Sequence, residues 1–183
     1  MKLKYLTSFE LEAIPPYNFE FTVHKPLGYH WLTPGEVFSN RTIWTAMELP
    51  SERVVGIRLK NIRTVENPMI EMAVFSDEKL EESEEKALIN DITKCAELNV
   101  DVNAFYSMAK RDSILKYTLV NLYGMRCGRQ QKLFHNVVRA ILMQWSSLER
   151  TKQMLKLLFQ SYARKIRFDS RPVCAWFTPK RIA

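Results

Sequence analysis

The sequence predicts an α+β protein, in which an antiparallel sheet formed by the N-terminal half packs beside helices formed by the C-terminal half. Segments between residues 5 and 76 are rich in β-branched and aromatic residues and are separated by turn signals. From residue 77 onward the apolar residues recur at helical spacing. Strands first and helices afterwards are typical of the α+β class.

The strand-rich part predicts an N-terminal domain over residues 1–98. Strands are expected at 19–23, 54–59 and 70–75, where apolar residues alternate or run continuously. One long helix is expected from about residue 77, with Ser76 and Asp77 as N-cap residues and acidic residues in its first turns. The acidic outer face of this helix is expected to be solvated.

The remaining residues, 99–183, predict a helical region. Two short helices are expected at 102–111 and 113–124, the second ended by Gly124. Two amphipathic helices follow at 131–144 and from residue 148, and a last helix is expected to begin in "FTPKRIA". Thr178 and Pro179 are expected to start the last helix. The residues expected to face inward on the first amphipathic helix are Leu133, Phe134, Val137, Val138, Ile141 and Leu142. Those expected to face inward on the second are Leu148, Thr151, Leu155, Leu158 and Tyr162.

Composition and cysteine usage exclude several classes of protein. The 183 residues are 46% hydrophobic and 26% charged, with no continuous apolar segment at the N-terminus that would read as a signal peptide. The longest apolar run falls short of the ~20 residues that span a bilayer. Three widely separated cysteines form no disulfide framework. We therefore expect an intracellular protein, cytoplasmic in a prokaryote or nuclear in a eukaryote.

Charge is divided unevenly along the chain. Residues 1–99 carry 11 Lys/Arg and 16 Asp/Glu, whereas residues 100–183 carry 16 Lys/Arg and only 4 Asp/Glu. A basic half of this kind is the electrostatic signature of a nucleic-acid-binding surface, although it also serves solubility.

The residues that carry chemistry in other enzymes are sparse. His24, His30 and His135 are expected to be structural or surface residues, because no Cys–His ligand spacing, phosphate-binding glycine loop or nucleophile motif surrounds them. Asp112 and Asp169 match no catalytic motif. The sequence assigns no catalytic residue, no metal ligand and no cofactor.

The stretch "AILMQWSSLERTKQM" (140–154) places a tryptophan between two predicted helices. Ser146 and Glu149 match the S-x-x-E capping box, which would place Trp145 directly before a helix N-terminus. Packing of its ring onto Arg150 would be weak, so the ring is expected to be partly exposed beside amides that favour a phosphate. Such an arrangement suits a wedge into a base stack, while the alternative is a core tryptophan.

The C-terminal half resembles the helix–hairpin–helix DNA glycosylase superfamily, in particular its 8-oxoguanine and 3-methyladenine DNA glycosylase II branch. The resemblance rests on an ordered set: "GMR" at 124–126, a helix with Phe134, "AI-x-x-Q-x-x-S" at 140–147 and "FTPKRIA" at the end. Upstream, "PPYNFEF" is similar to the opening of the superfamily's TATA-binding-protein-like sheet domain. The resemblance covers residues 12–183, more strongly from 122.

The resemblance implies roles for three residues at this corner. Trp145 matches the residue that fills the gap left by a flipped nucleotide, where relatives have Leu or Asn. Gln144 matches a polar residue that places the loop. Arg150 matches a residue that contacts the orphaned base, with a phosphate contact or exposure to solvent as the alternatives. The full set of expected DNA-binding residues is Gln144, Trp145, Ser146, Ser147, Arg150 and Lys152.

Two departures from the superfamily's pattern bear on activity. The glycine that approaches 8-oxoguanine has no clear equivalent, since Pro26 stands near that place and Gly28 two residues later. The superfamily's hairpin, its essential Asp and its Schiff-base Lys would lie beyond Ala183. The damaged-base pocket therefore stays unassigned, and this chain is expected to be the front part of such an enzyme, inactive in base release by itself.

Two functions follow as hypotheses. The first is a DNA-repair glycosylase-related protein that binds double-stranded DNA at a damaged or abasic site through bending and base flipping. The second is a non-catalytic assembly module whose exposed last helices bind a second polypeptide or another copy of the chain.

Overall fold

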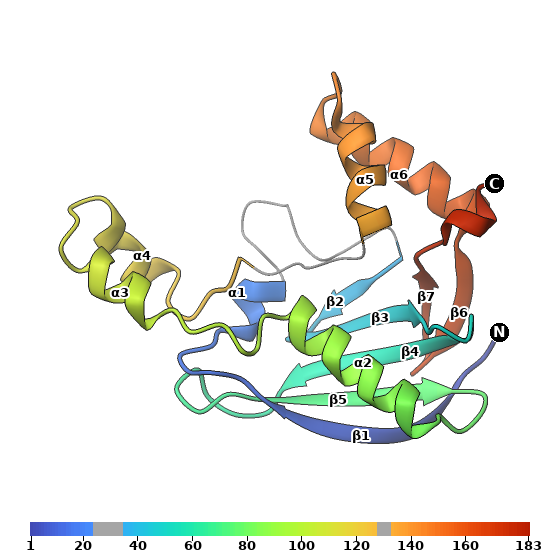
Figure 1. Ribbon diagram of the computed structural model, residues 1–183, viewed down its shortest axis with the longest axis horizontal. Helices are drawn as coiled ribbons and strands as arrows, with labels where there is room; N and C mark the ends of the chain where they lie inside the picture. Colours follow the sequence, from blue (N-terminus) through green and yellow to red (C-terminus); the bar gives the residue numbers. More distant parts are fainter. Residues whose placement is uncertain (24–34, 128–132) are drawn as a thin grey trace.

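The computed structural model describes residues 1–23, 35–127 and 133–183, and its architecture is α+β, as the sequence predicts (Figure 1). The main sheet is fully antiparallel, with strand order β1-β5-β4-β3-β2. Its strands are β1 (Lys4–Glu12), β2 (Val37–Ser39), β3 (Thr42–Glu48), β4 (Val54–Asn61) and β5 (Met69–Ser76). The strands predicted at 54–59 and 70–75 are thereby confirmed.

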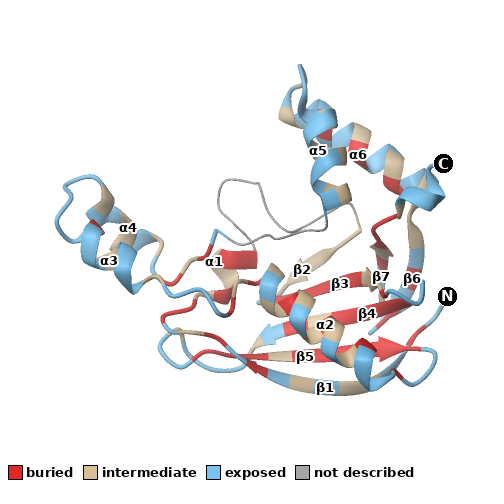
Figure 2. Ribbon diagram, viewed as in Figure 1, coloured by how far each residue is buried: buried red, intermediate tan, exposed pale blue. Residues whose placement is uncertain are grey.

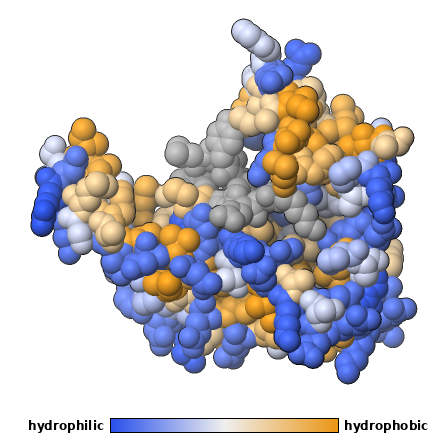
Figure 3. Space-filling view, viewed as in Figure 1, coloured by the Kyte–Doolittle hydropathy of each residue, from blue (hydrophilic) through white to orange (hydrophobic). Residues whose placement is uncertain are grey.

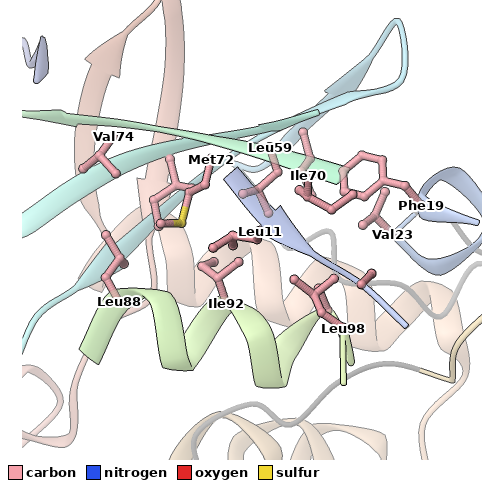
Figure 4. Packing of buried hydrophobic residues seen from close by; sticks show 14 of the residues in the cluster. Leu11, Phe19, Val23, Leu59, Ile70, Met72, Val74, Leu88, Ile92 and Leu98 are labelled. Carbon is pink, nitrogen blue, oxygen red and sulfur yellow. The ribbon is translucent and has the colours of Figure 1, made fainter. Parts of the chain in front are cut away.

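One face of this sheet is covered by helix α2 (Glu82–Cys95). Leu88 and Ile92 of the helix point toward side chains of the sheet such as Met72, and all three are buried (Figure 4). Because residues alternate between the two faces of a strand, the even-numbered positions of β5 face α2 and its odd-numbered positions face away. The main hydrophobic core lies between α2 and the sheet.

The opposite face of the sheet is covered by a hairpin of β6 (Arg164–Phe168) and β7 (Arg171–Ala175). The hairpin packs closely, since a Cβ added at Gly56 in β4 would lie 2.5 Å from the ring of Phe168. At the hairpin's turn, the indole Nε1 of Trp44 donates to Asp169 Oδ2 at 2.7 Å. Helix, sheet and hairpin thus form three layers (Figure 2).

The prediction that helices continue to the end of the chain is wrong over this hairpin. Residues 164–168 alternate exposed Lys165 and Arg167 with buried Ile166 and Phe168, which is the period of a strand with one face covered. Asp169 and Ser170 both have positive φ, at 47° and 61°, as a two-residue hairpin turn requires. The dipeptide Asp169-Ser170 is therefore the sequence signal that indicates a hairpin here instead of a helix.

The predicted strand at 19–23 is also wrong, because these residues form the short helix α1 (Phe19–Val23). The side-chain oxygen of Asn18 accepts from the amide of Phe21 at 3.0 Å and so caps the first turn. Phe19, Thr22 and Val23 are buried, at helical rather than strand spacing. Five residues are too few for periodicity to separate the two structures.

The helix predicted from residue 77 begins later, at Glu82. Ser76 does not cap it, because Ser76 is the last residue of β5 and pairs with Lys4. The cap is instead Glu81, whose amide donates to Glu84 Oε2 at 3.0 Å in a reciprocal capping box. Glu84 also accepts from the hydroxyl of Ser51 at 2.6 Å and pairs with Arg53.

These contacts make the stability of the fold depend on the charge of Glu84. The hydrogen bond from Ser51, followed by that from the Glu81 amide, lowers the pKa of Glu84 from its ordinary value of 4.5. A carboxylate with a lowered pKa stabilises the fold above its unfolded-state pKa, and that contribution is lost as the pH falls through its folded-state pKa.

We therefore expect Glu84→Gln to lower the melting temperature at pH 7 and to have a progressively smaller effect as the pH falls below about 4. Melting followed by circular dichroism across this range measures the difference. Glu82→Gln is the control, since the side chain of Glu82 is 81% exposed and pairs with the likewise exposed Lys86. An unchanged difference between pH 7 and pH 3 would rule out this role for Glu84.

A second, smaller part of the molecule projects from the sheet as an arm of α3 (Asn103–Ala109), a 3₁₀ turn (Leu115–Tyr117) and α4 (Thr118–Asn121) (Figure 1). The "GMR" motif returns the chain from this arm to the sheet. Gly124 has φ 75°, and a Cβ there would lie 2.7 Å from the amide nitrogen of Asn18.

Arg126, the last residue of that motif, is buried with 1% of its surface exposed. Its guanidinium donates to the carbonyl oxygens of Val100, Gly124 and Ile14 at 3.0, 3.3 and 2.9 Å. Burial lowers its pKa. The motif therefore joins the N-terminal part of the chain to the two ends of the arm.

The remaining helices are α5 (Leu133–Met143), α6 (Leu148–Tyr162) and a terminal 3₁₀ turn (Pro179–Arg181), with Thr178 as the predicted cap. In the described ranges, no helix combines the length and apolar character that crossing a membrane would require.

Candidate nucleic-acid interface

The corner between α5 and α6 is a tight turn that turns Trp145 outward. The amide of Gln144 donates to Ile141 O at 3.2 Å, and the amide of Ser146 donates to Met143 O at 3.4 Å, so α5 ends in a compact cap. Trp145 has φ 51°, in the left-handed region. Trp145 is 103% exposed. The expectation of an exposed ring is confirmed, and the core alternative is wrong.

This conformation is unfavourable for such a residue. A left-handed backbone costs about 1–2 kcal/mol for an L-residue with a Cβ, and full exposure of an indole gives no packing energy in return. Glycine would be the ordinary choice at such a turn. Strain combined with exposure of a large apolar ring points to a role outside the folding of the chain.

The cap of α6 differs by one residue from the prediction. Ser147, not Ser146, is the N-cap, and its hydroxyl accepts from the amide of Arg150 at 3.3 Å. The predicted capping box is absent here, because Glu149 lies in the first turn and pairs with Lys152 at 3.0 Å instead. Two adjacent serines leave the register open in the sequence, and the turn at Trp145 decides it.

Hydrogen bonds link the two helices at the corner although its tip is exposed. The single hydroxyl proton of Thr151 is shared between Leu142 O of α5 at 3.2 Å and Ser147 O at 3.0 Å. Thr151 is buried, as predicted. A ring presented from a fixed support loses little conformational entropy when it enters a partner.

The predicted DNA-binding residues lie together at this corner. Gln144, Ser147, Arg150 and Lys152 are exposed like Trp145, and Ser146 is half-buried. The ion pair of Lys152 with Glu149 is exposed on both sides and is therefore weak. In the described ranges Arg150 makes no ion pair. The first turn of α6 adds the positive end of its dipole.

A cluster of aromatic side chains packs α5 and α6 against the residues that follow β7. Phe159 of α6 packs edge-on against Trp176 at 4.8 Å, and Phe134 of α5 packs against Phe177 at 6.0 Å between ring centroids. His135 stacks on Trp176 at 4.4 Å, so its structural role is confirmed. Sequence reasoning missed Phe159 and Trp176, although the "CAWF" run at 174–177 offered a signal.

The amphipathic face of α5 is divided rather than continuous. Phe134, Val138 and Leu142 pack against the aromatic cluster. Leu133, Val137 and Ile141, predicted on the same inward face, are 79%, 44% and 60% exposed. Figure 3 shows apolar surface along α5. On α6, Thr151 and Leu155 are buried as predicted, and Leu158 and Tyr162 are partly buried in the same cluster.

The four carboxylates of residues 100–183 all have structural partners. Asp101 Oδ1 accepts from the amide of Asn103 at 2.8 Å, and Asp112 Oδ1 accepts from the amides of Ile114 and Leu115. Glu149 pairs with Lys152, and Asp169 accepts from Trp44 and Arg58. Pro26, Gly28, His24 and His30 lie outside the described residues.

Comparison with known proteins identifies this fold. No family model and no curated protein matches the sequence. Among solved structures, 3-methyladenine DNA-glycosylase from Archaeoglobus fulgidus superposes with a TM-score of 0.77 at 16% identity, covering 95% of this chain and 57% of that one. The 8-oxoguanine glycosylase/lyase of Clostridium acetobutylicum in its apo form gives a TM-score of 0.61 at 14% identity, covering 100% of this chain and 56% of that one. The same enzyme in complex with double-stranded DNA containing cytosine opposite 8-oxoguanine gives the same TM-score and identity. In that comparison 97% of this chain and 56% of the other are covered.

These similarities show the fold. The chain has the sheet-plus-helices architecture of DNA glycosylases and spans a little over half the length of the solved structures that it resembles. That share is consistent with the predicted likeness to an N-terminal portion of the superfamily.

Proposed function

We propose that this chain binds double-stranded DNA in base-excision repair, and that Trp145 fills the gap left in the base stack by a flipped or missing nucleotide. The observation that carries the proposal is the exposed indole on a strained corner that is hydrogen-bonded to α5. An inserted aromatic ring replaces stacking that the gap has removed, worth about 1–3 kcal/mol per stacked base. The fold shared with DNA glycosylases, one of them solved with double-stranded DNA, supports the same partner.

In this mechanism the residues around Trp145 hold the duplex while the ring enters it. Arg150 is placed to donate to the orphaned base or to a neighbouring phosphate. Lys152 and the first backbone amides of α6 would bind the phosphates that flank the gap. Gln144 and the hydroxyls of Ser146 and Ser147 would fix the loop on the backbone. Opening the stack is easiest where a base is damaged or absent.

Cleavage of the glycosidic bond is not part of the activity that we propose for the residues described. It requires a carboxylate that stabilises an oxocarbenium-like transition state, and the four carboxylates of residues 100–183 are engaged in the contacts given above. We propose that binding and gap filling are the contributions of this part, inside the cell, without a metal or cofactor. The division at residue 98/99 into a sheet domain and a helical region is proposed as well.

The test is binding to matched 20-base-pair duplexes, intact or with a central tetrahydrofuran abasic analogue, followed by fluorescence anisotropy. We expect tighter binding to the abasic duplex, and an affinity for both that falls steeply with salt because phosphates are neutralised. Single-stranded DNA of the same sequence is the control. Equal affinity for intact and abasic duplexes would contradict the proposal.

A second function is supported by the exposed apolar residues of α5. Leu133, Val137 and Ile141 form a stripe that a partner protein or a second copy could cover. Sedimentation at several concentrations separates the two proposals. A monomer that binds DNA supports the first, and an oligomer indifferent to DNA supports the assembly module.

A further inference from the structure

The outer surface of the β6–β7 hairpin carries cations that play no part in the corner at Trp145. Lys165 and Arg167 alternate with the buried Ile166 and Phe168, so both point away from the sheet. The N-terminal residues extend this surface, because Leu3 N donates to Arg167 O at 2.9 Å and Arg167 N donates to Met1 O at 2.8 Å. The pairing places Lys2 directly beside Arg167.

Strand geometry then brings like charges together. Paired residues of neighbouring strands project from the same face, so Lys2 lies with Arg167 and Lys165 on the outer side. Lys4 is not part of this group, because it pairs with Ser76 of β5 and so projects on the α2 side of the main sheet. We call Lys2, Lys165 and Arg167 the hairpin surface. In the described ranges none of the three forms an ion pair.

Two carboxylates close to this surface, Asp169 and Glu52, are already engaged by other residues. Asp169 accepts from Trp44 and Arg58, and Glu52 pairs with Lys180 at 2.7 Å. Like charges at directly paired positions destabilise a sheet. The fold therefore gains nothing from this grouping, whereas an anionic partner would.

We propose that the hairpin surface is a second site for the phosphate backbone of duplex DNA, separate from the corner at Trp145. The two sites lie at opposite ends of α6, whose 15 residues span about 22 Å, or roughly six base pairs. Contacts by lysine and arginine to phosphates carry no sequence or damage preference. The hairpin surface would thus bind undamaged duplex, while the ring of Trp145 at the corner enters the base stack where a base is flipped or missing. Its partner class rests on the proposed function.

The test combines K2Q, K165Q and R167Q in one variant and measures binding to intact and abasic 20-base-pair duplexes from 50 to 200 mM salt. Loss of three phosphate contacts should reduce the magnitude of the slope of log K against log salt by about 2–3 and weaken binding at low salt by roughly 10- to 100-fold. Both duplexes should be affected equally. The matched control removes three exposed lysines elsewhere, Lys60, Lys79 and Lys94, with the same change in net charge.

The outcomes separate this inference from the proposed function. An unchanged slope, or an equal change in the control variant, overturns the role of the hairpin surface even if the parent protein still prefers abasic DNA. A reduced slope in a parent protein without that preference supports the hairpin surface while contradicting the corner. Replacing Lys2 and Lys165 by arginine should retain the slope, and loss of binding in that variant would contradict a purely electrostatic role. Binding of an acidic protein to the hairpin surface, without binding of DNA there, would also overturn the proposed phosphate site.

Discussion

Replacing Arg126 by alanine is expected to lower the free energy of unfolding by about 3–5 kcal/mol, a large part of the 5–15 kcal/mol typical of a domain. The variant leaves the carbonyl oxygens of Val100, Gly124 and Ile14 buried without their donor. It also empties the space beside the ring of Tyr17, over which the guanidinium lies at 5.5 Å. Urea unfolding followed by circular dichroism measures the effect.

Arg126→Lys should recover only part of the loss, because one ammonium cannot reproduce a planar group that donates to three separate carbonyls. Arg150→Ala is the matched control, since Arg150 is exposed and should change stability by less than about 0.5 kcal/mol. A loss below about 1 kcal/mol in Arg126→Ala would show that the ends of the arm are held by other contacts.

Replacing Trp145 by alanine is expected to weaken binding to abasic duplex by roughly 10- to 100-fold and binding to intact duplex by less than about threefold. The first figure is the loss of one stacked ring, about 1–3 kcal/mol. The second is small because an intact stack offers no gap to enter. Anisotropy titrations of both duplexes with both proteins give the four affinities that are needed.

Stability separates this effect from unfolding. Because the side chain is fully exposed and the backbone there is strained, Trp145→Ala should not lower the melting temperature, and Trp145→Gly should raise it slightly. Leu157→Ala is the control for an exposed apolar side chain on α6, where 62% of the residue is exposed. Equal losses of affinity on both duplexes would assign Trp145 to general contact rather than to the gap.

Much of the fold could be predicted from residue patterns. The strands at 54–59 and 70–75 and the helices α5 and α6 have enough residues to display their period. The failures occur where the pattern is short or where another element decides the outcome. The five residues at 19–23 are too few to show that Asn18 caps a helix there. Ser76 has the side chain of a helix cap, but it is the last residue of strand β5 and therefore does not cap α2.

The candidate site was predictable in position but not in detail. Its six residues follow one another closely in the chain, so a turn between two helices was enough to gather them. The cap at Ser147 and the left-handed backbone of Trp145 depend on Thr151, which binds back to α5. Arg126 and Trp176 were missed because each depends on contacts with residues distant in the sequence. The hairpin surface likewise needs the pairing of Lys2 with Arg167.

The central claim is that the indole of Trp145 enters the stack, and 2-aminopurine placed next to the abasic analogue reports on this directly. Its fluorescence depends on how its neighbours stack. We expect saturating protein to change the emission, Trp145→Leu to give a smaller change, and Trp145→Ala to give none at equal occupancy. The same change in emission with Trp145→Ala as with the parent protein would contradict the claim.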